Sequence, residues 1–102
     1  MLIRQGDIML RPINKIPDDA AKEKRAAGRI VLAWGEATGH AHVIEKRNAT
    51  SYVLKDRRFL GVVDVPVLLK HEEHAPIEVP VGDYEIVRQV TYTPEEIRSV
   101  AD

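Results

Sequence analysis

The chain has 102 residues, of which 44% are apolar and 30% charged, a composition typical of a folded globular protein rather than a disordered one. Fifteen basic against sixteen acidic residues leave a net charge of −1, which argues against a dedicated nucleic-acid or membrane-surface binder. The absence of cysteine excludes disulfides, thiolate metal ligands and thiol nucleophiles. The length predicts a single domain over residues 1–102. The N-terminus does not resemble a signal peptide and no apolar run is long enough to span a membrane, so we expect a cytoplasmic protein.

The first half of the chain has the pattern of short strands. Apolar and β-branched residues predict strands, in chain order, at 7–13, 29–34, 40–46 and 50–55. Pro12 restricts the first of them to an edge position. Between the first two strands, Asp18 or Asp19 can cap a short helix over 20–27 that ends at Gly28. The same segment is charged and rich in alanine, so a loop is the alternative.

The second half continues the pattern and ends on a helix signal. The run 58–70 is interrupted by Gly61 and Pro66, which predicts two shorter strands or a bulged one. Further strands are expected at 77–81 and 84–92. "YTPEE" then offers Thr93 as N-cap, with proline and glutamate in the first turn of a C-terminal helix. The predicted fold is therefore an all-β small barrel or sandwich with a short C-terminal α-helix.

Histidine is confined to two short segments, "GHAHVIE" and "KHEEHAP", which contain His40 and His42, and His71 and His74. Residues two apart on a strand share a face, so His40 and His42 should point the same way. His71 and His74 stand three apart at a strand end, where a turn can bring them together. Neutral imidazole is a common protein ligand for transition metals.

These four histidines are the predicted metal or small-ligand site. Zinc, iron, nickel or manganese would each suit such a site, and a bound ion could polarise a substrate or activate a water molecule. Glu72, Glu73 and Glu85 are the candidate general bases if the site is catalytic. The alternative is that the histidines are unrelated surface or core residues, because "KHEEH" is polar enough to be a solvated loop.

Two stretches resemble the motifs of the cupin family, which are β-barrels that bind a divalent ion. The first motif corresponds to Gly35, His40, His42 and Glu45, and the second to Pro80, Gly82 and Glu85. Glu45 stands one residue nearer His42 than the motif requires, and Glu85 occupies the place of the motif's histidine. The resemblance implies an ion bound by His40 and His42, with Glu45 or Glu85 as further ligands.

Two other resemblances cover more of the chain. "GEATGHAH", "HEEHAPIEVPVGDYEIVRQ" and "YTPEE" together are similar to a recurrent small bacterial and phage-type protein of unassigned function. "LIRQGDIMLRPI", "AAGRIVLA", "VPVGDYEIV" and "EEIRSVAD" resemble, in the same order, the ten-kilodalton co-chaperonins, which are open β-barrels forming heptameric rings. That family implies a homo-oligomer whose mobile loop binds a chaperonin, with Ile30, Val31 and Leu32 as the apolar patch. A buried strand is the other interpretation of these three residues.

A third possibility is a small interaction module without a site. The densest basic patch, "KDRR" at 55–58, is best explained as a solvated turn, so we expect no nucleic-acid partner. Asp7 beside Gly6 and Asp83 beside Gly82 are interpreted as turn residues without a catalytic role. Arg88 and Gln89 are candidate pocket residues, and outward-facing strand positions are the alternative for them.

Overall fold

A computed structural model describes residues 2–34 and 41–88. Within these residues the chain is all-β, with strands β1 (Ile3–Gln5), β2 (Ile8–Ile13), β3 (Ala21–Lys22), β4 (Ile30–Trp34), β5 (Ala41–Ile44), β6 (Ala49–Leu54), β7 (Arg57–Val62), β8 (Val67–Leu69), β9 (Ile77–Val79) and β10 (Gly82–Arg88). The predicted C-terminal helix lies outside the described residues. No helix long and apolar enough to cross a membrane occurs in the described part of the chain.

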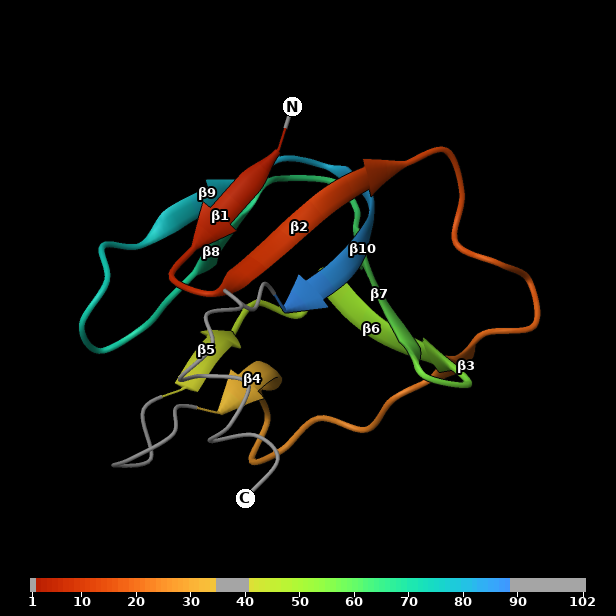
Figure 1. Ribbon diagram of the computed structural model, residues 1–102, viewed down its shortest axis with the longest axis horizontal. Helices are drawn as coiled ribbons and strands as arrows, with labels where there is room; N and C mark the ends of the chain where they lie inside the picture. Colours follow the sequence, from red (N-terminus) through yellow and green to blue (C-terminus); the bar gives the residue numbers. More distant parts are fainter. Residues whose placement is uncertain (1, 35–40, 89–102) are drawn as a thin grey trace, which may run out of the picture.

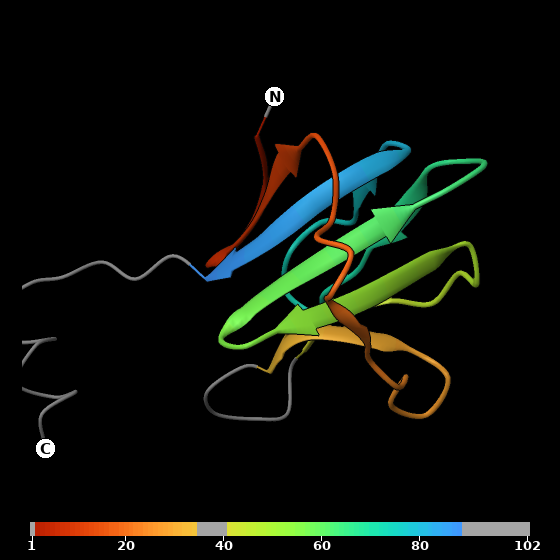
Figure 2. The same cartoon turned by 90° about the vertical axis from the view of Figure 1, so that its right-hand side faces the viewer.

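The strands form one large sheet and two hairpins (Figure 1). The six-stranded sheet has the order β1-β2-β10-β7-β6-β3, and the hairpins are β4-β5 and β8-β9. Figure 2 shows β10 (blue), β7 (green) and β6 (yellow-green) side by side in a twisted layer. The all-β prediction is confirmed for the described residues. No continuous ladder of hydrogen bonds closes the described strands into a barrel.

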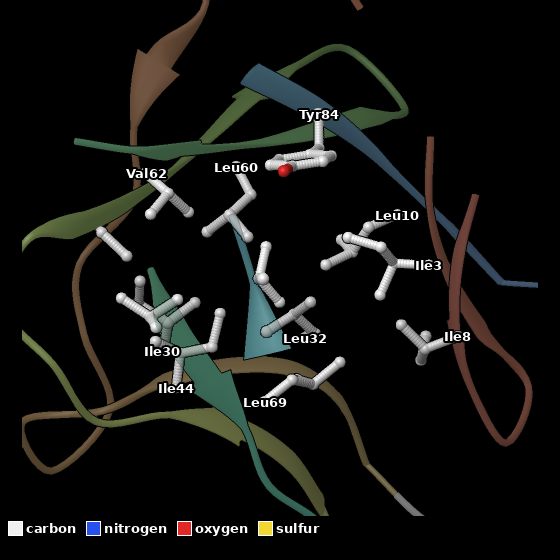
Figure 3. Packing of buried hydrophobic residues seen from close by; sticks show 13 residues of the cluster. Ile3, Ile8, Leu10, Ile30, Leu32, Ile44, Leu60, Val62, Leu69 and Tyr84 are labelled. Atoms are coloured by element: carbon white, nitrogen blue, oxygen red, sulfur yellow. The ribbon is translucent and has the colours of Figure 1, made fainter. Parts of the chain in front are cut away.

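The core lies between the large sheet and the two hairpins, as Figure 3 shows. Leu10, Leu60 and Tyr84 point inward from the sheet, while Ile44 and Leu69 meet them from the hairpins. Side chains alternate between the two faces of a strand, so β1, β2 and β8 supply their buried residues at every second position, whereas β5 is buried on both faces. The charged residues at alternate positions, such as Arg4 in β1, are left at the surface.

The helix considered for residues 20–27 is wrong. Ala21 and Lys22 form β3, which pairs with Val53 and Tyr52 of β6. The segment has few large apolar side chains to pack as a helix, and its backbone is satisfied by the edge of the sheet instead. Arg25 further fixes it by donating a hydrogen bond to the carbonyl of Ala49, at 2.8 Å.

Two other expectations can be compared directly. The run 58–70 divides into β7 and β8, as predicted, with the break at 63–66, where Asp64 has a φ of 69°. Gly61 itself remains inside β7. Ile30 and Leu32 are 2% and 3% exposed within β4 and belong to the core, as the buried-strand interpretation predicts. Binding of a chaperonin stays a prediction. Ile30 and Leu32 do not form the exposed apolar patch that such binding would use, because both are buried.

Candidate functional site

His42 is buried by the position of β5. The register between β4 and β5 shifts between Val31 and Ala33, so that Ala33 lies opposite His42. On its other edge, β5 exchanges two backbone hydrogen bonds between Val43 and Lys70, each 2.9 Å. A strand with partners on both edges is held firmly, and the His42 side chain is only 3% exposed.

The Val43–Lys70 bridge brings three of the four predicted histidines together. Because Lys70 immediately precedes His71, the loop at 71–76 lies next to the start of β5. The ring centroids of His42 and His71 are 4.4 Å apart, those of His71 and His74 are 4.7 Å apart, and those of His42 and His74 are 6.2 Å apart. His40 lies outside the described residues. The two histidine segments therefore meet at one place in the fold.

Gln5 fixes the orientation of His42 from the other side. Its amide nitrogen donates to the carbonyls of Leu69 at 2.8 Å and Ala75 at 2.9 Å, so its amide oxygen must be the acceptor that faces His42. Nδ1 of His42 lies 2.9 Å from that oxygen and donates to it. In the neutral ring the proton is therefore on Nδ1, and Nε2 carries the lone pair.

Nε2 of His42 faces a carboxylate. Oδ1 of Asp7 lies 3.4 Å from it, while Oδ2 accepts a hydrogen bond from Nε of Arg88 at 2.7 Å. Asp7 follows Gly6, whose φ of +60° forms the tight turn between β1 and β2. This turn lies directly on the imidazoles, because a Cβ at Gly6 would stand 2.8 Å from Nε2 of His74 and 3.3 Å from Cε1 of His42.

The surroundings keep His42 neutral and Asp7 ionised. Burial, followed by the charge of His71, lowers the pKa of His42, and Asp7 opposes this only partly. Burial would raise the pKa of Asp7, but the hydrogen bond and charge of Arg88 outweigh burial and hold that pKa below its ordinary value. A neutral imidazole lone pair thus faces a carboxylate, an arrangement that attracts a cation.

Side chains of the 71–76 loop stabilise the loop itself. Nδ1 of His71 accepts hydrogen bonds from the backbone N–H of Glu73 at 3.0 Å and of His74 at 3.3 Å. The Glu72 carboxylate accepts from the backbone N–H of Ala41 at 3.0 Å and ties the loop to the start of β5. In this arrangement Nδ1 of His71 serves the turn, whereas the exposed His74 side chain is the one beside Gly6.

Glu85 is held in a different environment from the histidines. It points to the face of β10 opposite the core residue Tyr84, and it forms ion pairs with Arg57, at 2.9 Å, and with Arg11. The hydrogen bond from Arg57, and then that from Arg11, lowers the pKa of Glu85 despite its burial. A carboxylate stabilised in its charged form is a weak base, so this geometry favours a structural role for Glu85.

The arrangement is not a preformed metal centre. Among residues 2–34 and 41–88, no group of three or more histidine, cysteine, aspartate or glutamate side chains is placed to hold a metal ion. Two donor atoms, Nε2 of His42 and Oδ1 of Asp7, already converge. A third requires a side-chain rotation, which an exposed imidazole such as that of His74 can make at little cost.

Sequence reasoning missed both Gln5 and Asp7 as site residues. Gln5 is 2% exposed although it is polar, and apolar periodicity has no means of finding an inward-pointing amide. Asp7 was assigned to a turn, which is correct. The only available signal was the Gly-Asp pair itself, and it does not reveal that the turn lies on histidines 35 or more residues further along the chain.

The chain belongs to a family described as "Domain of unknown function (DUF8820)", whose model matches residues 4–89. The matched span includes Gln5, Asp7 and all four histidines. No curated protein and no solved structure gives a significant match. The family description assigns no activity and gives no support to the cupin or co-chaperonin resemblance.

Proposed function

We propose that this protein binds a divalent metal ion between the β1–β2 turn and the 71–76 loop, through His42, Asp7 and His74. Imidazole and carboxylate donors without thiolates suit zinc, with iron, nickel and manganese as alternatives. An ion with three protein ligands keeps a position open for water or a small ligand, and there it can act as a Lewis acid or activate a bound water.

The pairing of His42 with Asp7 carries the proposal. With the Nδ1 proton of His42 directed at Gln5, the Nε2 lone pair and the Asp7 carboxylate face each other across 3.4 Å. A lone pair and a carboxylate oxygen at this distance repel each other unless a proton or another cation lies between them. Burial disfavours the extra proton on His42, which leaves a metal ion as the partner that best satisfies both groups.

The spacing of these two atoms agrees with shared ligation. Two ligands at about 2.0–2.1 Å from a tetrahedral zinc ion stand roughly 3.3 Å apart. The Nε2–Oδ1 distance of 3.4 Å is close to this value. Gln5 completes the resemblance to a metal site, because metal-binding histidines usually donate their second ring N–H to a fixed acceptor that sets the orientation of the ring.

His74 is the best third donor. It lies on the exposed loop, and its Nε2 is close to the backbone of Gly6, the residue preceding Asp7. Rotation about its side-chain bonds can direct Nε2 toward the space between His42 and Asp7 without moving the backbone. His71 would then keep its bonds to the loop backbone and support the position of His74.

Zinc titration of the tag-free, chelator-treated protein tests the proposal. We expect one zinc per chain by calorimetry and, with cobalt as a substitute, the intense visible absorption of a tetrahedral site. Asp7→Asn, which keeps the size of the side chain, should weaken zinc binding at least about ten-fold. Asp64→Asn removes the same charge from an exposed position between β7 and β8, outside the proposed ligand set, and should leave binding unchanged.

Three further variants define the ligand set. His74→Ala should weaken zinc binding as much as Asp7→Asn, while His71→Ala should have a smaller effect. His40→Ala shows whether the remaining histidine contributes. A folded wild type that takes up no zinc at micromolar concentrations, or an equal loss in Asp7→Asn and Asp64→Asn, would overturn the proposal.

A further inference from the structure

A second feature, separate from the histidines, is a cavity of about 600 Å³ between the large sheet and β4. Its apolar lining comes from β2, β4 and β10 and consists of Ile8, Val31, Leu32, Ala33 and Ile86. Its charged lining consists of Asp56, Arg58 and Arg88. These three strands can be followed in Figure 1, where β4 lies below the start of β2 and the end of β10. A cavity of this size, whose lining combines apolar and charged side chains, suits a small molecule that has both an apolar and a charged part.

Arg58 is a fixed part of the cavity wall. Its guanidinium donates to the carbonyl of Leu32 at 2.7 Å, to that of Val31 at 3.0 Å and to the Glu23 carboxylate at 3.1 Å. These bonds join β7 to the irregular part of β4, and Glu23 offsets the charge of Arg58. Arg58 therefore shapes the wall and is not the group that attracts a ligand.

Arg88 is different, because most of its hydrogen-bonding capacity is unused. Its Nε donates to Asp7 at 2.7 Å, while its two terminal NH₂ groups make no hydrogen bond to any described residue. A guanidinium presents paired N–H groups that match the two oxygens of a carboxylate. With Nε already held by Asp7, the terminal edge of Arg88 is oriented in advance for such a partner.

We propose that this cavity binds a small monocarboxylate with an apolar body, its carboxylate on the NH₂ groups of Arg88 and its apolar part against the half-buried Val31, Ala33 and Ile86. The negative charge of Asp56 on the rim repels anionic groups, so the cavity favours a ligand that carries one negative charge, placed beside Arg88. The proposal does not depend on metal binding, since Arg88 uses different atoms for Asp7 and for the ligand.

Titration with 4-phenylbutyrate, and with the neutral 4-phenylbutan-1-ol as matched probe, tests this on the full chain in the presence of EDTA. We expect the carboxylate to bind and the alcohol to bind at least about ten-fold more weakly. Arg88→Gln should reduce carboxylate affinity by a similar factor and leave the alcohol unaffected. Arg4→Gln removes an exposed arginine outside the cavity and should change neither. Asp56→Asn should leave carboxylate binding equal or tighter.

A second variant separates loss of the site from loss of the fold. Ala33→Phe fills the cavity from β4 and should abolish binding of both probes, while backbone amide resonances show whether the chain remains folded. The proposal is overturned if folded wild type does not bind the carboxylate at millimolar concentration, if both probes bind equally, or if Arg4→Gln and Arg88→Gln weaken binding alike. The chelator keeps these outcomes independent of the histidine site.

Discussion

Replacing Gln5 by methionine should destabilise the fold and weaken the proposed metal site together. The two side chains have similar length and volume, so the substitution leaves little cavity and its effect comes from the lost amide. That amide makes three hydrogen bonds, two donated to the carbonyls of Leu69 and Ala75 and one accepted from His42. Because Gln5 is only 2% exposed, water cannot take the place of these hydrogen-bond partners.

The expected cost follows from those three bonds. Each contributes about 1 kcal/mol net, and a buried group left without a partner costs about as much again or more. We therefore expect Gln5→Met to lose at least about 3 kcal/mol of unfolding free energy, a large part of the stability of roughly 5–15 kcal/mol typical of one domain. Without the acceptor for its Nδ1 proton, His42 is no longer oriented, and zinc affinity should fall about 10–100-fold.

Urea unfolding followed by circular dichroism measures the first effect, and calorimetric zinc titration measures the second. Arg4→Met places the same new side chain on the neighbouring, exposed position of β1 and should change stability by no more than about 0.5 kcal/mol. A loss below about 1 kcal/mol for Gln5→Met, with an unchanged dependence on urea, would refute the reasoning, because three buried hydrogen bonds cannot be removed so cheaply.

Three further predictions use the same unfolding assay. Gly6→Ala and Gly28→Ala both place a side chain at positive φ, and each should lose about 1–2 kcal/mol of unfolding free energy. Only Gly6→Ala should weaken zinc binding, because its Cβ would meet His74 and His42, whereas nothing lies within 4 Å of a Cβ at Gly28. Glu85→Gln should be less stable than wild type at pH 7. Because Arg57 holds the pKa of Glu85 below its ordinary value of 4.5, the difference in unfolding free energy between wild type and Glu85→Gln should persist above pH 4.5 and vanish as the pH falls through the folded-state pKa. A difference in unfolding free energy that stays constant down to pH 2 would contradict this prediction. Leu60→Ala, at a fully buried position, should lose about 3 kcal/mol, and a loss under about 1 kcal/mol would place Leu60 outside the core.

Much of the strand content could be predicted because it follows from apolar alternation. β6 and β9 match the expected segments closely, and the division of 58–70 follows from residues that break strands. β1 was missed because it has only three residues and one of its two buried side chains is Gln5. The segment at 20–27 was ambiguous between a helix and a loop because it offers almost no large apolar side chain to pack, and the pairing of β3 with β6, which excludes the helix, is not visible in the local sequence.

The candidate site could be predicted only in part. The grouping of histidines in the sequence predicted one shared site; the rings of His42, His71 and His74 lie close together, and their sharing of a metal or ligand stays a prediction. Their meeting depends on the bridge between Val43 and Lys70, which no local pattern encodes. Asp7 is further away still, and it reaches His42 only because β1 and β2 form a hairpin at the edge of the large sheet.

The burial of Gln5 has a cause in the topology of the fold. β1 is one of the two outer strands of the large sheet, and among the described strands its backbone pairs with β2 alone. The Gln5 side chain projects from the buried face of β1, and its amide donates to the carbonyls of Leu69 in β8 and Ala75 in the adjoining loop. One side chain thus joins the large sheet to the β8-β9 hairpin and, with its remaining oxygen, orients His42. Besides the shared hydrophobic core, Gln5 thus links these two parts of the fold and also orients His42, so we expect a substitution at Gln5 to change stability and the geometry of the proposed site together.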